Sequence, residues 1–248
     1  MNDEKSLFVY FVGGSKGGVG KSIFCMLLAD YLTKCKGQKI ILVESDTSNP
    51  DVGKTFIHND EVEVIPLSLD SADGWVKLVN YADTCKKDIV INSAARSEEA
   101  VEKFGGTLTE SLDELHRTLI SFWIINRQRD SIELLKRYMD VVPGELHVVR
   151  NTFFGEAEKF ELFNESNTKI EAEKRGVTID CPDLADRVTD DLYSNRLSIA
   201  KATEEMPIGN RAELKRWMSR GWKMFDAIGS TDYARQKENN NSAKGEQA

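Results

Sequence analysis

The sequence predicts a single α/β domain in which helices flank a doubly wound, mainly parallel sheet. Its 248 residues are 40% hydrophobic, which is enough to bury one full core. Short apolar runs, typical of buried parallel strands, alternate along the chain with longer stretches of helical periodicity. A glycine-rich turn joins the first apolar run to the first helical stretch. In such a sheet the carboxyl ends of the strands meet at one edge, and we expect the binding site there.

The expected elements run from a first strand at residues 7–12 to a last helix at residues 211–228. Further strands are expected at residues 39–43, 63–69 (a short or edge strand), 88–92, 119–125, 145–149 and 177–180. Further helices are expected at residues 23–32, 72–85, 97–117, 131–139, 153–173 (one or two helices) and 185–203. The domain is therefore expected to span residues 1–230. Residues 231–248 are polar and nearly free of apolar side chains, which predicts a disordered tail.

The turn after the first strand, residues 13–22 (GGSKGGVGKS), has the composition of a phosphate-binding loop. Its glycines allow positive φ and let the backbone close on phosphate oxygens. The backbone N–H groups and the positive end of the following helix then face one anion. Lys21 supplies a charge for the β- and γ-phosphates, and the Ser22 hydroxyl is placed to ligate Mg²⁺. The predicted phosphate-binding residues are Ser15, Gly17, Gly18, Val19, Gly20, Lys21, Ser22 and Ile23.

Two departures from the usual loop pattern identify its nearest relatives. Ser15 stands where the first glycine is expected, and Lys16 adds a second lysine. The resulting pattern, Lys-Gly-Gly-x-Gly-Lys-Ser, resembles the deviant Walker A motif of the ParA/MinD superfamily, which are P-loop NTPases of the SIMIBI type. The resemblance implies that ATP closes a nucleotide-sandwich dimer, in which Lys16 reaches the partner's ATP and Lys21 acts within its own subunit. Among these proteins the chain looks nearest to the plasmid-encoded StbB and TraL kind.

A polar loop follows the second strand, at residues 44–51 (ESDTSNPD). In the resembling superfamily this loop is the first switch. The resemblance assigns Asp46 to a catalytic role, orienting or polarising the attacking water near the γ-phosphate and the Mg²⁺ site. A solvated acidic turn remains the alternative, because Asn, Pro and Asp are also common loop residues.

The strand at residues 88–92 occupies the place of the Walker B strand, but it ends in Asn92 where an aspartate is expected. Asp88 cannot substitute, because it lies some 13 Å back along the strand at about 3.3 Å per residue. Either Asn92 holds a Mg²⁺-bound water as a neutral acceptor, or magnesium binding and turnover are weakened. An aspartate would bring a full negative charge. From the sequence alone, Asn92→Asp is therefore expected to lower the Mg²⁺ concentration that the ATPase needs.

The resemblance also implies residues that contact the base of the nucleotide. In the resembling superfamily an asparagine after the strand at 145–149 contacts adenine, and Asn151 holds that position. The alternative for Asn151 is a cap at the strand end. The loop at residues 181–184 matches the one that lies over the base in relatives, so Pro182 is a further candidate.

Charge and cysteine content restrict the partners. The net charge of −8 implies that any DNA binding is local and conditional. The helix at residues 211–228 has one basic face, which predicts either packing with a solvated surface, a DNA contact, or a membrane-surface contact. That face carries Arg211, Lys215, Arg216, Arg220 and Lys223.

The four cysteines contain no C-x-x-C pair, so we expect no zinc or iron–sulfur site. No apolar run is long enough for a membrane span, so we expect a cytoplasmic protein.

These observations favour an ATP- and Mg²⁺-dependent homodimerising ATPase, slowed where Asn92 weakens turnover, that positions or segregates plasmid DNA with a partner protein. Three alternatives stay open. A ligase of the dethiobiotin-synthetase kind would phosphorylate a carboxylate and would need a substrate pocket. A scaffold that hydrolyses nucleotide slowly is suggested by Asn92. An iron–sulfur carrier of the same superfamily is disfavoured by the scattered cysteines.

Overall fold

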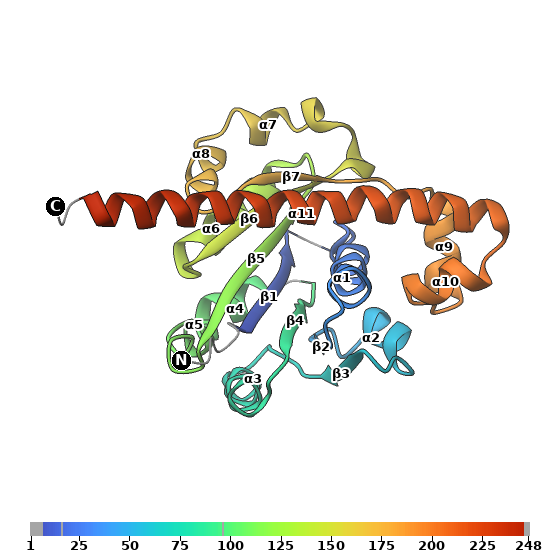
Figure 1. Ribbon diagram of the computed structural model, residues 1–248, viewed down its shortest axis with the longest axis horizontal. Helices are drawn as coiled ribbons and strands as arrows, with labels where there is room; N and C mark the ends of the chain where they lie inside the picture. The colour runs from blue at the N-terminus through green and yellow to red at the C-terminus, as the bar shows by residue number, and fades with distance from the viewer. Residues whose placement is uncertain (1–6, 16, 96, 246–248) are drawn as a thin grey trace.

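The computed structural model describes residues 7–15, 17–95 and 97–245, with side chains described as far as residue 228. Its centre is a seven-stranded sheet in the order β3-β2-β4-β1-β5-β6-β7, in which every neighbouring pair is parallel (Figure 1). The strands are β1 (Leu7–Gly14), β2 (Ile40–Glu44), β3 (Val62–Pro66), β4 (Asp88–Asn92), β5 (Arg117–Ile125), β6 (Glu145–Asn151) and β7 (Thr178–Cys181). The single doubly wound domain predicted from the sequence is therefore confirmed, with β3 at an edge as expected.

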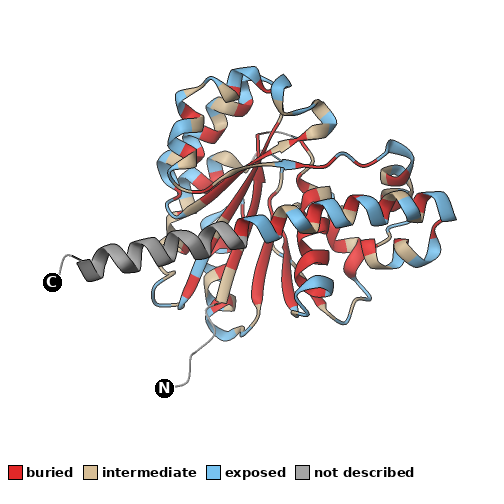
Figure 2. Ribbon diagram, turned by 45° about the horizontal axis from the view of Figure 1, so that its top comes forward, coloured by how far each residue is buried: buried red, intermediate tan, exposed pale blue. Residues whose placement is uncertain are grey.

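Helices cover both faces of the sheet, and the five central strands bury apolar residues on both sides. Along β1, Val12 packs on one side and Val9 and Phe11 pack on the other, as the two-residue period of a strand requires. The first face carries α1 (Lys21–Asp30) with its extension η1 (Tyr31–Cys35), α2 (Asp51–Phe56), α9 (Asp186–Ser194), α10 (Ile199–Glu205) and α11 (Ile208–Gly245). The second face carries α3 (Ala72–Thr84), α4 (Glu98–Phe104), α5 (Gly106–Thr109), α6 (Arg129–Val141), α7 (Glu161–Asn164) and α8 (Asn167–Glu173). Figure 2 shows the buried strands enclosed between these two layers.

The long helix α11 crosses the domain on the same side as α1 (Figure 1). Its buried residues recur every three or four positions, among them Leu214, Trp217 and Phe225. Polar contacts fix it to the first helix: Trp222 Nε1 donates to Asp30 at 3.1 Å, and Tyr31 donates to Asp226 at 2.8 Å. Thus α1 and η1, which follow the glycine-rich loop, also hold α11 in place.

Three segments differ from the sequence-based expectation. The single helix expected at 97–117 is two short helices, α4 and α5, which meet at the Gly105–Gly106 pair, and β5 already begins at Arg117. The segment 153–173 is broken into two 3₁₀ turns (η2, Thr152–Phe154; η3, Ala157–Lys159) and the short helices α7 and α8. The segment 185–203 is two helices, since the chain turns at Arg196 with φ of 50°.

The C-terminal segment was expected to lose helical structure after residue 230. The backbone instead continues as α11 to Gly245. The division into a domain at 1–230 and a tail at 231–248 stays a prediction. Within the described part of the chain, no helix combines the length and the apolar character needed to cross a bilayer.

Candidate nucleotide site

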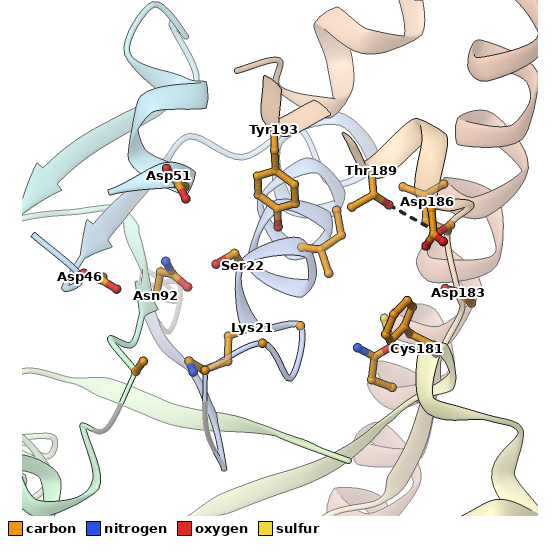
Figure 3. A pocket seen from close by; sticks show the side chains of 18 of the residues that line it. Lys21, Ser22, Asp46, Asp51, Asn92, Cys181, Asp183, Asp186, Thr189 and Tyr193 are labelled. Carbon is orange, nitrogen blue, oxygen red and sulfur yellow. Dashed lines mark hydrogen bonds between the residues drawn. The ribbon is translucent and has the colours of Figure 1, made fainter. Parts of the chain in front are cut away.

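A cavity of about 440 Å³ opens where β1, β2, β4, β6 and β7 end, over the amino terminus of α1 (Figure 3). This is within the size range of small-molecule sites, and its place at the carboxyl ends of parallel strands is the usual one for ligands of doubly wound folds. The sequence-predicted residues that line it are Gly17, Gly18, Gly20, Lys21, Ser22, Ile23, Asp46, Asn92, Asn151 and Pro182. Ser15 and Val19 lie beside the cavity without lining it, and Lys16 falls outside the described residues.

The loop is held in place by contacts beneath it. The Ser15 hydroxyl is buried and shares a hydrogen bond of 2.5 Å with the Ser131 hydroxyl at the start of α6. Ser15 therefore supports the loop from below, which gives a structural reason for a serine in place of the usual glycine. Val19 is also buried, and its carbonyl accepts a hydrogen bond of 2.8 Å from Nδ2 of Asn151.

Lys21 is the first residue of α1, and only 8% of its surface is exposed. Burial lowers the pKa of its ammonium group, while the nearby carboxylates of Glu98 and Asp46 raise it. A cation at a helix amino terminus meets the positive end of the helix dipole, an unfavourable arrangement that a bound anion would relieve. The phosphate end of a nucleotide is the ligand that this arrangement fits.

Asp46 follows β2 on the opposite wall of the cavity from the loop (Figure 3). Its Oδ1 accepts hydrogen bonds from the Ser48 hydroxyl at 2.6 Å and from the Asn49 amide at 3.0 Å. The carboxylate thus orders its own loop and still lines the cavity. Its role toward the γ-phosphate stays a prediction.

The end of β4 brings a buried polar pair to the same wall. Asn92 Nδ2 donates a hydrogen bond of 2.9 Å to Oε1 of Glu44, and both residues are buried. Burial raises the pKa of the Glu44 carboxyl, and hydrogen bonds from the Gly53 amide, Asn92 and the Asp46 amide oppose that rise. Oδ1 of Asn92 is buried with no hydrogen-bond partner among the described residues, and Asn92 lines the cavity.

The oxygen atoms of Ser22, Asp46 and Asn92 are chemically suited to Mg²⁺, and a magnesium site on these residues stays a prediction. Hydroxyl, carboxylate and amide oxygens are ligands of the kind that Mg²⁺ takes, and the unsatisfied Oδ1 of Asn92 lacks a partner that such a site would supply. No cluster of three His, Cys, Asp or Glu side chains suited to a metal occurs in the described ranges. Mg²⁺ needs no such cage, because it usually keeps several waters and binds substrate phosphates.

The opposite end of the cavity is formed by the loop after β7. Pro182 is buried, and its carbonyl accepts a hydrogen bond of 2.6 Å from Trp217 Nε1 of α11. Asn151, at the end of β6, uses its amide for the Val19 carbonyl and its oxygen for the Phe153 amide at 3.1 Å. Both halves of the Asn151 side chain are therefore engaged in bracing the two loops, and its role toward adenine stays a prediction.

Sequence reasoning missed Tyr193, which reaches the cavity from α9. Figure 3 shows its hydroxyl directed toward Ser22. Burial raises the pKa of the Tyr193 phenol, nearby Asp51 adds to this rise, and a hydrogen bond with the Ser22 side chain opposes it. Only the packing of α9 over α1 brings these residues together, so no local signal in the sequence indicates Tyr193.

A testable consequence concerns Gly20, which has φ of 101° immediately before α1. A Cβ there would collide with Nδ2 of Asn151 and disrupt the hydrogen bond that this atom donates to the Val19 carbonyl. We expect Gly20→Ala to lower the melting temperature of the nucleotide-free protein by roughly 5 °C or more, from backbone strain and a lost hydrogen bond together.

The matched control is Gly37→Ala. Gly37 also has a positive φ, of 65°, but a Cβ there would meet nothing within 4 Å. This variant measures the cost of placing a side chain at positive φ when no neighbouring atom is struck. Equal losses of melting temperature in the two variants would show that the contact between Gly20 and Asn151 has no energetic role.

A parallel sheet whose central strand leads through a glycine-rich loop into a helix beginning Lys-Ser defines a P-loop nucleotide-binding domain. The chain belongs to the CobQ/CobB/MinD/ParA nucleotide-binding domain family, whose model matches residues 10–159. This confirms the resemblance drawn from the loop motif.

Individual proteins agree with this assignment. Protein MobD of Acidithiobacillus ferrooxidans is 52% identical over 224 residues, which make up 89% of this chain and 97% of that protein. A putative plasmid partition protein from Borrelia burgdorferi bound to AMPPNP has a TM-score of 0.55 at 16% identity, covering 88% of this chain and 98% of that one. MinD in the MinC:MinD complex of Aquifex aeolicus has a TM-score of 0.54 at 15% identity, covering 86% and 94% of the two chains. The likeness to the two solved structures is one of fold.

Proposed function

We propose that this protein is a dimerising switch ATPase that binds ATP with Mg²⁺ and uses it to position or segregate plasmid DNA together with a partner protein. The observation that carries the proposal is the cavity itself. It extends from Lys21, Ser22 and Asp46, where the proposal places the phosphates, to the loop at Pro182, where it places the base. The motif supports dimerisation, because Lys16 matches the lysine that acts across the dimer in the superfamily.

Each side chain has a defined task in this proposal. Lys21 and the loop amides bind the β- and γ-phosphates. Ser22, Asp46 and Asn92 would hold Mg²⁺, which when bound neutralises phosphate charge. Asp46 orients the attacking water. Closure by Lys16 of the partner subunit would exclude bulk solvent, and hydrolysis would release the dimer.

Asn92 favours a second candidate, a scaffold that binds nucleotide and hydrolyses it slowly. A neutral amide makes weaker hydrogen bonds than a carboxylate, so the Mg²⁺ site has less negative charge than an aspartate would give it. The two candidates share the nucleotide-dependent dimer and differ only in how long it lasts.

The plasmid role draws support from the Borrelia neighbour, which is described as a putative plasmid partition protein. The surface offered to DNA in the proposal is the basic face of α11, since Lys215, Arg216, Arg220 and Lys223 are all exposed. Arg216 is partly neutralised by Glu213, which it contacts at 2.8 and 2.9 Å. A dimer would present two such faces at once.

We expect the ATP-bound protein to bind duplex DNA without sequence preference, with an affinity that falls steeply as salt rises. Replacing Arg216, Arg220 and Lys223 with Glu should abolish this binding, because three phosphate contacts become repulsive. The measurement is fluorescence anisotropy of a labelled duplex with ATP and with ADP, over a series of salt concentrations.

The matched control makes the same charge change on the other layer of the domain, at the exposed Lys86, Lys136 and Lys174. This control should bind DNA nearly as well as wild type. Equal loss in both triple variants would mean that net charge alone governs binding, and unchanged binding in both would remove the basic face of α11 from the proposal. Loss of vesicle binding instead of DNA binding would assign the face to an anionic membrane surface.

A further inference from the structure

Glu44 is a fully buried acidic residue at the last position of β2. Its Oε2 accepts a hydrogen bond of 2.9 Å from the Gly53 amide in α2. Its Oε1 accepts one of 2.9 Å from Asn92 Nδ2 and a longer one of 3.3 Å from the Asp46 amide. One carboxylate thus ties together the end of β4, the Asp46 loop and the first turn of α2.

The parallel register explains why this pair forms. β4 inserts between β2 and β1, so that Glu44 lies directly opposite Asn92. Because the facing carboxylate can only accept a hydrogen bond, the amide of Asn92 must present its Nδ2 to Glu44. Its Oδ1 is then left on the other side, buried and unpartnered among the described residues, and it is directed toward Ser22 at the edge of the cavity that both residues line (Figure 3).

We propose that Glu44 is a positioning residue that carries the negative charge which Asn92 lacks and that directs the Asn92 oxygen into the nucleotide cavity. A hydrogen bond from the amide to a charged group polarises the amide and strengthens its oxygen as an acceptor. The acidic charge of this wall therefore resides on β2, one strand away from its usual place on β4. This inference rests on the proposed function, since it describes how the same site accommodates Mg²⁺ and phosphate.

The hydrogen bond between Asn92 and Glu44 reverses the sequence-based expectation that Asn92→Asp lowers the Mg²⁺ requirement. An aspartate at this position would replace a donor with an acceptor that faces Oε1 of Glu44 across about 2.9 Å. Two like charges that close oppose one another in a buried site. We therefore expect Asn92→Asp to lower the stability of the folded protein, and we do not expect it to lower the Mg²⁺ concentration that the protein needs.

Exchanging the two chemical groups should restore the pair. In the double variant Glu44→Gln with Asn92→Asp, the new glutamine can donate to the new aspartate and still accept from the Gly53 amide. Asn92→Asp alone sets an acceptor against Glu44. Glu44→Gln alone keeps both bonds only if the Asn92 amide turns over, so that its Oδ1 faces the glutamine and its Nδ2 faces the cavity.

The experiment is a double-mutant cycle on the full chain, read first by thermal unfolding without nucleotide or metal. Asn92→Asp should lower the melting temperature by roughly 5 °C or more, Glu44→Gln should lower it less, and the double variant should recover most of the loss caused by Asn92→Asp. The control Glu99→Gln, in which an exposed glutamate on α4 is changed, should match wild type. Additive losses in the double variant would show that Glu44 and Asn92 are not coupled, which would overturn the inference.

The second readout is the Mg²⁺ concentration for half-maximal binding of a fluorescent ATP analogue. Glu44→Gln should raise that concentration about tenfold, the effect of weakening one charge-assisted hydrogen bond, and the double variant should return it close to wild type. An unchanged Mg²⁺ requirement in Glu44→Gln would overturn the charge-carrying role. The unfolding cycle needs no nucleotide, so it still tests the pair if the wild type fails to dimerise or hydrolyse ATP and the proposed function falls.

Discussion

Lys21→Ala is expected to lower the affinity for ATP by about a hundredfold or more, since breaking one partner of a buried charged pair costs about 3–5 kcal/mol. Lys21 is almost entirely buried at the start of α1, and burial lowers its pKa. Without its ammonium group, the phosphates would be left to the loop amides and the helix dipole. Titration with a fluorescent ATP analogue at fixed Mg²⁺ measures the loss.

Lys39→Ala provides the matched control, because Lys39 is exposed just before β2 and far from the loop in the sequence. It should bind the analogue as wild type does. If Lys21→Ala retained wild-type affinity while remaining folded, the cavity would not be the phosphate site. The assignment of the P-loop would then fail at its central residue.

Lys16→Ala is expected to have the opposite pattern, with nucleotide affinity close to wild type and loss of the ATP-dependent dimer. Residue 16 lies outside the described residues, so this expectation comes from the loop motif. A lysine that acts across the dimer contributes little to the affinity of a single subunit. It becomes essential when two subunits close on two nucleotides.

The same fluorescent titration separates the two lysines. Lys16→Ala should bind the ATP analogue within about threefold of wild type, a difference of well under 1.4 kcal/mol. Equally poor binding by Lys16→Ala and Lys21→Ala would mean that Lys16 contacts the nucleotide of its own subunit. The loop motif would then no longer support the nucleotide-dependent dimer.

Much of the fold could be predicted from the sequence because most of its strands are short, nearly continuous apolar runs. Residues such as Ile40–Glu44 and Asp88–Asn92 are buried throughout, so their apolar runs have a single interpretation. The segments that were predicted poorly are those with mixed signals. Between Thr152 and Glu173 the chain packs by isolated residues such as Phe160 and Phe163, and no period of 3.6 extends far enough to define one helix.

The backbone geometry of the glycine-rich loop could also be predicted, because its residues are contiguous and their conformation depends on local sequence. Gly18 and Gly20 do take positive φ, and Lys21 and Ser22 do begin α1. The contacts between distant segments could not. The pairing of Glu44 with Asn92 depends on the strand order, in which β4 returns to lie between β2 and β1.

The position of Tyr193 could not be predicted either, because it depends on how two helices pack. It meets Ser22 because α9 packs over α1, an arrangement set by side chains such as Val188 and Leu192 in the shared core. Likewise, Asn151 was expected from its strand-end position, whereas its bond to the Val19 carbonyl follows from the way the loop curls toward β6. The sequence therefore indicates which residues gather at the sheet edge, and the packing decides which of them touch.

The nucleotide-dependent dimer is tested most directly by the molar mass of the protein in solution. Light scattering coupled to size exclusion would compare wild type and Lys16→Ala with Mg²⁺ and either ADP or a non-hydrolysable ATP analogue. The monomer mass is 27.9 kDa. We expect wild type to have this mass with ADP and about twice this mass with the ATP analogue, and Lys16→Ala to stay monomeric with both. A wild type that binds the ATP analogue and keeps its monomer mass would contradict the switch.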